Sequence, residues 1–235
     1  METAVVAGVG PGLGASIARA FAKEGYSIGL LSRNSESSLP VATQIQAAGG
    51  KVLALPVDVT DRKVVFQAIE RIRSDLGLVT VLAYNASGFG RGDFLDLDPE
   101  VIRQSFEAGT MGAVHLAQAL IPEMLKACHG FISLTGATAS LRGRAGFAPL
   151  AIAKSSLRML GQSLAREFHP KGIHVVHVIV DGQIDTPRIR ARAPDRPPGT
   201  MIPPDTIADA IIHAFRQPRN GWTHELDIRP CMESF

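Results

Sequence analysis

The stretch TAVVAGVGPGLGASIARAF, residues 3 to 21, decides the fold. It begins as a run of small and β-branched residues, which is typical of a buried strand, and then passes through four closely spaced glycines. An amphipathic helix pattern follows at once, with Ile17 and Phe21 four residues apart on one face. A strand that turns through glycines directly into a helix predicts the first unit of an α/β fold.

The rest of the chain repeats this alternation of short apolar runs and helix-length stretches. Nearly all residues of the apolar runs are hydrophobic, as a parallel sheet buried on both faces requires. We therefore predict one α/β domain over residues 1–235, a doubly wound parallel sheet of the Rossmann type with helices on both faces. The expected strands are 3–8, 26–32, 51–57, 79–84, 130–135 and 174–180, and 225–228 is expected to add a strand at a sheet edge.

Composition narrows the classes of partner. The formal net charge is +2 over 235 residues with no long run of like charges, so neither nucleic acid nor a membrane is expected as a partner, and a small molecule is. Cys128 and Cys231 lie far apart without metal-ligand spacing, which favours a reducing, cytoplasmic location. No metal site is predicted, since His174 and His177 would point to opposite faces of one strand and His115 is expected on a helix surface or interface.

One segment breaks the alternation. Residues 185–204, DTPRIRARAPDRPPGTMIPP, combine several prolines with Arg188, Arg190, Arg192 and Arg196, so a regular helix cannot run through all of it. We interpret 185–204 as a mobile loop or substrate lid, whose arginines would suit an anionic substrate or simply face solvent.

The glycine-rich turn predicts a nucleotide site. Free N–H groups at a helix N-terminus, together with the helix dipole, hold a pyrophosphate where no side chain blocks the approach. Gly8, Gly12 and Gly14 suit that role, and Gly10 with Ala15 satisfies the related G-x-G-x-x-A pattern.

Further motifs in chain order resemble those of the short-chain dehydrogenase/reductase family, and the resemblance covers nearly the whole chain. They are the glycine spacing at 8, 12 and 14, Asp58 in LPVDVT, Asn85 in YNASG, Lys154, and DGQIDT at 181 to 186. The resemblance implies cofactor contacts from Gly8, Gly10, Gly12, Leu13, Gly14, Ser32, Arg33, Asn34, Asp58, Val59, Asn85, Ala86, Lys154, Gly182, Ile184 and Thr186. It also implies a homodimer or homotetramer formed through long helices near 100–127 and 148–169.

The end of the second predicted strand indicates which cofactor is bound. A carboxylate there would accept from the 2′-hydroxyl of NAD(H), whereas an arginine suits the 2′-phosphate of NADP(H). This chain has Ser32, Arg33 and Asn34 and no carboxylate at the strand tip, which favours NADP(H) over NAD(H). The alternative is that Arg33 is a solvated surface charge with Glu36 as its partner.

The residues that would complete the family's active site are replaced. By resemblance, a tyrosine donates the proton, a serine holds the substrate oxygen and an asparagine orders a water, and these positions hold Leu150, Ala137 and Gly109. None of the three side chains can donate or accept a proton. Lys154 remains, and in the family it also contacts the nicotinamide ribose.

Other groups could serve the reaction. Thr138 and Ser140 are the hydroxyls nearest to the vacated serine position, and Asp181 is the nearest carboxylate, with a loop or capping role as its alternative. Two functions stay open. One is an NADP(H)-dependent oxidoreductase with a non-standard active site, and the other is a catalytically impaired nucleotide-binding or regulatory protein with the same fold.

Overall fold

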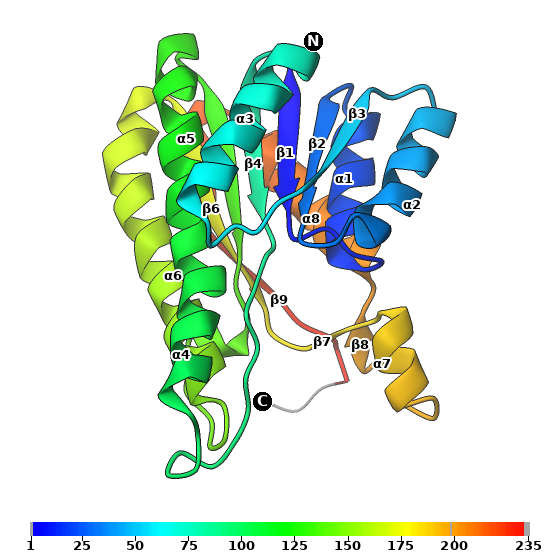
Figure 1. Cartoon of the computed structure of the whole chain (residues 1–235), viewed down its shortest axis with the longest axis vertical. Helices are drawn as coiled ribbons and strands as arrows, with labels where there is room; N and C mark the ends of the chain where they lie inside the picture. The colour runs from blue at the N-terminus through cyan, green and yellow to red at the C-terminus, as the bar shows by residue number, and fades with distance from the viewer. Residues whose placement is uncertain (1, 198, 233–235) are drawn as a thin grey trace.

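The computed structural model describes residues 2–197 and 199–232, and Figure 1 shows the course of the chain. The predicted domain 1–235 and the predicted lid 185–204 therefore include a few positions, residues 1, 198 and 233–235, that lie outside the described residues. The strands are β1 Thr3–Ala7, β2 Ser27–Ser32, β3 Val52–Pro56, β4 Val79–Tyr84, β5 Gly130–Thr135, β6 Ile173–Val180, β7 Gln183–Ile184, β8 Met201–Ile202 and β9 Glu225–Ile228.

The helices fill the intervals between the strands. They are α1 Leu13–Lys23, α2 Ser35–Ala47, α3 Arg62–Leu76, α4 Pro99–Phe106, α5 Gly112–Ala127, α6 Ala148–Phe168, α7 Pro187–Arg192 and α8 Pro204–Phe215, with short turns η1 Glu107–Met111, η2 Thr138–Ser140, η3 His169–Lys171 and η4 Arg219–Gly221. The helix expected near 100–127 is interrupted, because η1 is a π-helical turn between α4 and α5.

A seven-stranded sheet with the order β3-β2-β1-β4-β5-β6-β9 forms the centre of the molecule, and every neighbouring pair in it is parallel. Helices α3, α5 and α6 pack on one face and α1, α2 and α8 on the other, which Figure 1 shows as two layers. The doubly wound parallel sheet is thereby confirmed, and β9 occupies the edge predicted for 225–228. The chain reverses its strand order between β1 and β4, where sheets of this kind bind ligands.

The buried histidines test two of the expectations. His115 is buried on α5 with its Nδ1 3.1 Å from the carbonyl oxygen of Val59, so the expectation of a surface position is wrong. The reason is that this face of α5 covers the sheet. His174 and His177 do lie on opposite faces, since His174 stacks on Trp222 while His177 faces α6.

The predicted lid contains more order than a loop. Thr186 caps the N-terminus of α7, Pro187 opens that helix, and β7 pairs with β8 in a separate two-stranded sheet. Proline is well tolerated at the first position of a helix because its missing N–H has no intrahelical partner there. The segment thus contains the short helix α7, which begins soon after β7, and the strand β8.

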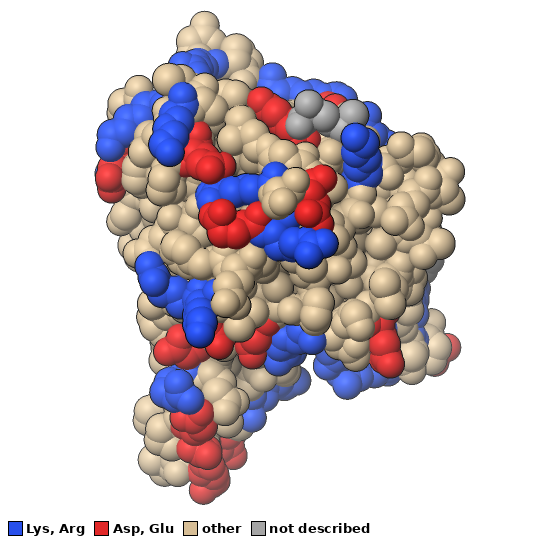
Figure 2. All heavy atoms as spheres, turned by 45° about the horizontal axis from the view of Figure 1, so that its top comes forward, with Lys and Arg blue, Asp and Glu red and all other residues tan. Residues whose placement is uncertain are grey.

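Charges on the face shown in Figure 2 lie in small mixed groups of Lys or Arg with Asp or Glu. Pairs of this kind in the molecule include Arg73 with Glu123 at 3.0 Å and Arg19 with Asp205 at 3.4 Å. Among the described helices, none is long and apolar enough to cross a membrane.

Candidate active site and nucleotide cleft

A cleft of about 960 Å³ opens at the carboxyl ends of β1, β2 and β4. The glycine turn and the segments that follow β2, β3 and β4 supply part of its lining, and α4 and η1 supply another part, with α7 contributing a single side chain. Its lining consists of Gly8, Val9, Gly10, Leu31, Ser32, Arg33, Asn34, Ser37, Val57, Asp58, Val59, Thr60, Asn85, Ala86, Ser87, Arg103, Gln104, Glu107, Ala108 and Arg188.

The glycine turn contributes Gly8, Val9 and Gly10 to the lining of this cleft. Gly8 has φ +83°, and a Cβ there would collide with the backbone nitrogen of Ala86, so only glycine fits. Asn85 holds the turn from the next strand, since its Nδ2 donates to the carbonyl oxygen of Gly8 at 2.9 Å. A Cβ at Gly10, by contrast, would meet no protein atom within 4 Å. The backbone at Gly10 is therefore open toward the cleft, and this cradle fits the pyrophosphate of a dinucleotide.

The segment after β2 presents Arg33 to the cleft. Asn34 caps α2 by accepting from the backbone N–H of Glu36 at 2.9 Å, and its Nδ2 donates to the Glu36 carboxylate at 3.2 Å. Ser32 is held inward by donating to the carbonyl oxygen of Asn34 at 2.8 Å. Arg33 is exposed and forms no ion pair with any described residue, so Glu36 is engaged by Asn34 and not by Arg33.

The predicted cofactor residues divide into two groups. Gly8, Gly10, Ser32, Arg33, Asn34, Asp58, Val59, Asn85 and Ala86 line the cleft. Gly12, Leu13, Gly14, Lys154, Gly182, Ile184 and Thr186 lie outside its lining. Sequence reasoning missed the wall formed by Arg103, Gln104, Glu107 and Ala108, because no local motif marks which face of a helix turns toward a cleft.

Lys154 lies buried at the carboxyl end of β5. Its Nζ donates to the carbonyl oxygen of Thr135 at 2.7 Å, and the residue is only 5% exposed. Burial lowers the pKa of the Lys154 ammonium to about 8. A buried cation with one hydrogen bond costs stability, so its presence suits a functional role better than a packing role.

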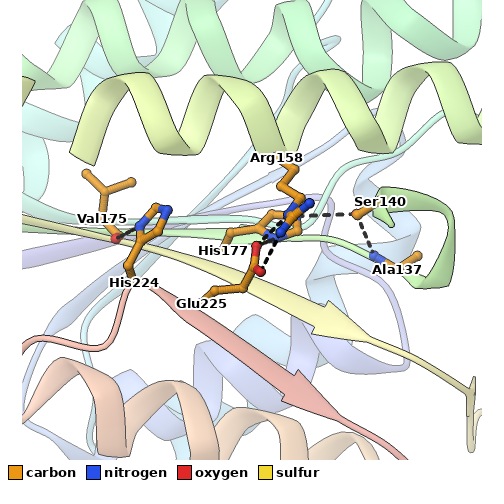
Figure 3. Close-up of polar contacts among 7 residues, drawn as sticks. All are labelled: Ala137, Ser140, Arg158, Val175, His177, His224 and Glu225. Carbon is orange, nitrogen blue, oxygen red and sulfur yellow. Dashed lines mark hydrogen bonds and ion pairs between the residues drawn. The ribbon is translucent and has the colours of Figure 1, made fainter. Parts of the chain in front are cut away.

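Ser140 belongs to a chain of polar contacts that leads from the turn after β5 to the edge strand β9 (Figure 3). Its Oγ accepts from the backbone N–H of Ala137 at 3.1 Å and lies 3.3 Å from Nε2 of His177. Nδ1 of His177 is 3.3 Å from Oε2 of Glu225, and Arg158 donates to both oxygens of that carboxylate at 2.7 and 2.8 Å. The chain joins α6, β6 and β9 to the turn.

The electrostatics of this chain keep His177 neutral. Burial lowers the pKa of His177 to about 4, and the hydrogen bonds from Arg158 lower the pKa of Glu225. The neutral imidazole can then donate from Nδ1 to Glu225 and accept at Nε2 from Ser140. A Cβ at Gly136 would collide with Nε2 of His177, so the turn is packed directly on the ring. Ser140 is buried and fixes the turn from within.

Thr138 and Asp181 contact each other beside that turn. The Thr138 hydroxyl donates to Oδ1 of Asp181, while Oδ2 of Asp181 lies 3.1 Å from Arg229 and 3.8 Å from Arg142. Asp181 is only 8% exposed. The structure therefore brings the two predicted residues together and engages both in a hydrogen-bonded ion-pair cluster.

Residue 109, where the family resemblance predicts an asparagine, has no room for a side chain because two helices pack closely there. Gly109 lies in the π-turn η1, and a Cβ there would be 2.7 Å from the Cβ of Ala153 on α6. Thr110 reinforces this contact by donating to the carbonyl oxygen of Ala153 at 2.8 Å. The close approach of η1 and α6 depends on glycine at residue 109.

These features define a class: an α/β protein with a glycine-lined nucleotide cleft at the switch point of a parallel sheet. Comparison with known proteins gives the family. The model of the short chain dehydrogenase family matches residues 2–197. The chain therefore belongs to the short-chain dehydrogenase family, whose members act on small molecules. Membership of this family makes it an oxidoreductase of the short-chain dehydrogenase type.

Known relatives match nearly the whole chain. An uncharacterised oxidoreductase of Staphylococcus aureus is 26% identical over 230 residues, which cover 97% of each chain. A crystal structure of a short-chain dehydrogenase from Rhodopseudomonas palustris has 33% sequence identity and a TM-score of 0.82, covering 97% of this chain and 98% of that one. A metagenomic short-chain oxidoreductase in complex with NADP has 25% identity and a TM-score of 0.84, covering 98% of each chain.

Proposed function

We propose that this protein is an NADP(H)-dependent oxidoreductase that acts on a small molecule without the family's tyrosine, serine and asparagine. The observation that carries the proposal is the cleft itself, with an open glycine cradle at Gly10 and with Arg33, which has no ion-pair partner among the described residues, where NAD-binding members would need a carboxylate. The similar metagenomic oxidoreductase in complex with NADP supports the same preference.

In this proposal the cleft holds the dinucleotide through two kinds of contact. The glycine turn holds the pyrophosphate with backbone N–H groups, and Arg33 contacts the 2′-phosphate. The bound dinucleotide would supply or accept a hydride. Lys154, which lies outside the lining of the cleft, is the family residue left to orient the nicotinamide ribose.

The absence of a phenol at residue 150 restricts the substrate. Loss of a positioned general acid costs a factor of about 10² to 10⁴. Substrates that need no carbonyl protonation, such as activated alkenes or iminium ions, lose less than ketones do. We therefore expect turnover with enones or imines to exceed turnover with simple ketones.

The test is NADPH oxidation, followed at the absorbance of the reduced nicotinamide, with a panel of ketones, enones and imines. Turnover of at least one class that requires the protein supports the proposal. If no compound of the panel is turned over and NADPH nevertheless binds tightly, the oxidoreductase proposal is excluded. The nucleotide-binding function then remains.

That binding function is the second candidate, and a specific observation favours it. The hydrophilic groups predicted for the substrate end are engaged within the protein: Lys154 with Thr135, Ser140 with His177, and Thr138 with Asp181. Such a protein would bind the dinucleotide and act through its conformation or its assembly.

Assembly and compartment belong to the proposal as well. A homodimer or homotetramer through α5 and α6 is supported by the exposure of Ile152 and Met159 on α6, at 41% and 50%. A cytoplasmic location is supported by the two free, exposed cysteines, which suit a reducing compartment. We also propose that residues 185–204 act as a substrate lid, which is supported by the position of α7, whose Arg188 lines the cleft.

A further inference from the structure

The first turn of α7 is docked on the glycine turn. A Cβ at Gly12 would lie 2.8 Å from Cγ2 of Thr186, so glycine is needed for this close approach. Thr186 also caps α7 by accepting from the backbone N–H of Ile189 at 3.4 Å. The start of α7 is thereby fixed beside the turn that would hold the pyrophosphate.

The three arginines of α7 have different surroundings. Arg190 donates to both carboxylate oxygens of Asp185, at 2.7 and 2.6 Å. Arg192 is exposed and lies outside the cleft lining. Arg188 lines the cleft together with Gly8 and Gly10, and it forms no ion pair with any residue of the described chain.

The other charges of the cleft have partners within the protein. Arg103 donates from Nε to the Glu100 carboxylate at 2.7 Å and lies 4.0 Å from Glu107. Asp58 accepts from the backbone N–H and the hydroxyl of Thr60, at 3.0 and 2.8 Å. Within residues 2–197 and 199–232, Arg33 and Arg188 are thus the cleft arginines left without an ion-pair partner. Two free guanidinium groups suit a ligand with two separate anionic groups.

We propose that Arg188 binds the pyrophosphate of the dinucleotide from the lid side, in addition to the contact of Arg33 with the 2′-phosphate that belongs to the proposed function. This inference rests on the proposed function. The position of each residue decides its role, because Arg188 follows the segment docked at Gly12, whereas Arg33 follows β2 at the adenosine end. Arg188 then contributes to the binding of NADPH and NADH alike, and Arg33 contributes to NADPH alone.

The experiment is calorimetric titration of the full chain with NADPH and with NADH, for the wild type, Arg188→Gln, Arg33→Gln and Arg192→Gln. Arg188→Gln removes a charge-assisted hydrogen bond to the pyrophosphate. The affinities for NADPH and NADH should therefore fall by the same factor of about 10 to 100. Arg33→Gln should weaken NADPH by a similar factor and leave NADH unchanged. Arg192→Gln, on the same helix, should change neither affinity.

Each other outcome has a defined meaning. If Arg188→Gln leaves both affinities unchanged, or weakens NADPH alone, the pyrophosphate assignment is overturned while the proposed function stands. If the wild type binds neither dinucleotide, the proposed function fails first. All three arginines are exposed, so matching thermal melting curves of the variants and the wild type are expected and would show that the fold is kept.

Discussion

The two ends of the crevice at the carboxyl edge of the sheet differ in how their polar groups are used. At the nucleotide end, Gly10 faces open space and the guanidinium groups of Arg33 and Arg188 lack ion-pair partners in the described chain. At the substrate end, Lys154 and Ser140 are buried and bonded to the protein itself. The nucleotide end therefore presents open surface to a ligand, whereas the polar groups predicted for the substrate end are engaged within the protein, and the two sets of groups lie on different elements.

Placing a tyrosine at residue 150 has the largest expected effect on the difference between the two ends, and the effect is on the rate of ketone reduction. Leu150→Tyr places a hydroxyl one helical turn before Lys154, whose buried ammonium would lower the pKa of the new phenol. With Ala137→Ser in the same chain, NADPH-dependent ketone reduction should rise by about 10² to 10⁴. The measurement is the initial rate with the ketones of the panel.

Leu150→Phe with Ala137→Ser is the matched control, because it has the ring without the hydroxyl. Equal rates for the Tyr and Phe chains would contradict the account of the missing acid. The asparagine cannot be restored in the same way, since a side chain at residue 109 collides with Ala153. Gly109→Asn therefore requires Ala153→Gly beside it.

A larger side chain at Gly10 should abolish dinucleotide binding at the nucleotide end of the crevice. In Gly10→Val the new side chain meets no protein atom near its Cβ, so the fold is kept while the approach of the pyrophosphate is blocked. The affinity for NADPH should fall by about a hundredfold or more, which is the loss of about 3 kcal/mol of binding free energy. Titration calorimetry measures it.

Gly221→Val is the control, because a Cβ at Gly221 would also meet no atom within 4 Å and this residue lies outside the cleft lining. Its NADPH affinity should equal that of the wild type. Unchanged affinity in Gly10→Val would show that the dinucleotide does not use this turn.

Nine of the predicted cofactor residues line the cleft and none of the predicted catalytic residues does, for a physical reason. A strand, a glycine turn and a helix are local features, so residues such as Gly8 and Gly10 can be assigned to a cleft from their own segment of chain. The tip of β2, with Arg33, follows equally from a local pattern. The parallel order of the strands then follows from the alternation of apolar runs and helices.

Contacts between distant segments could not be predicted in this way. The His177 chain joins residues from η2, α6, β6 and β9, and no pattern in any of these segments indicates the others. The packing of Gly109 on Ala153 likewise depends on two helices meeting at a π-turn. Arg188 is one of four arginines in the predicted lid, but its place in the cleft depends on the docking of Thr186 at Gly12.

Removing the buried cation tests whether Lys154 is held at a cost in stability. Its pKa, lowered to about 8 from 10.5, means that the folded protein resists protonation of this amine, so stability rises with pH between these values and the ammonium is unfavourable at pH 7. Lys154→Met should therefore raise the free energy of unfolding at pH 7, by about 3 kcal/mol at most. Urea unfolding measures it.

Lys63→Met serves as the control for this prediction, because Lys63 is exposed and its replacement should change stability by less than about 0.5 kcal/mol. A stability loss in Lys154→Met would mean that the lysine packs as a structural residue. Weaker NADPH binding in the same variant would agree with the role that the family resemblance implies.

Acidification should lower the free energy of unfolding because His177 becomes protonated. Burial lowers the pKa of His177 in the folded protein to about 4. The contribution of the neutral imidazole to stability is therefore complete above pH 6.5 and is lost as the pH falls toward 4. In this window the free energy of unfolding should drop by about 1.4 kcal/mol for each pH unit from this one group. His177→Asn should flatten that slope in urea unfolding series, whereas His213→Asn, on the exposed side of α8, should not.

The central claim is that a working dinucleotide site has been kept beside a disrupted proton-transfer site. Titration of the purified wild-type chain with NADPH, and with NADH for comparison, tests it most directly. We predict micromolar binding of NADPH and binding of NADH that is weaker by about tenfold or more, the worth of one charge-assisted contact to the 2′-phosphate. No heat of binding with either dinucleotide would contradict the claim.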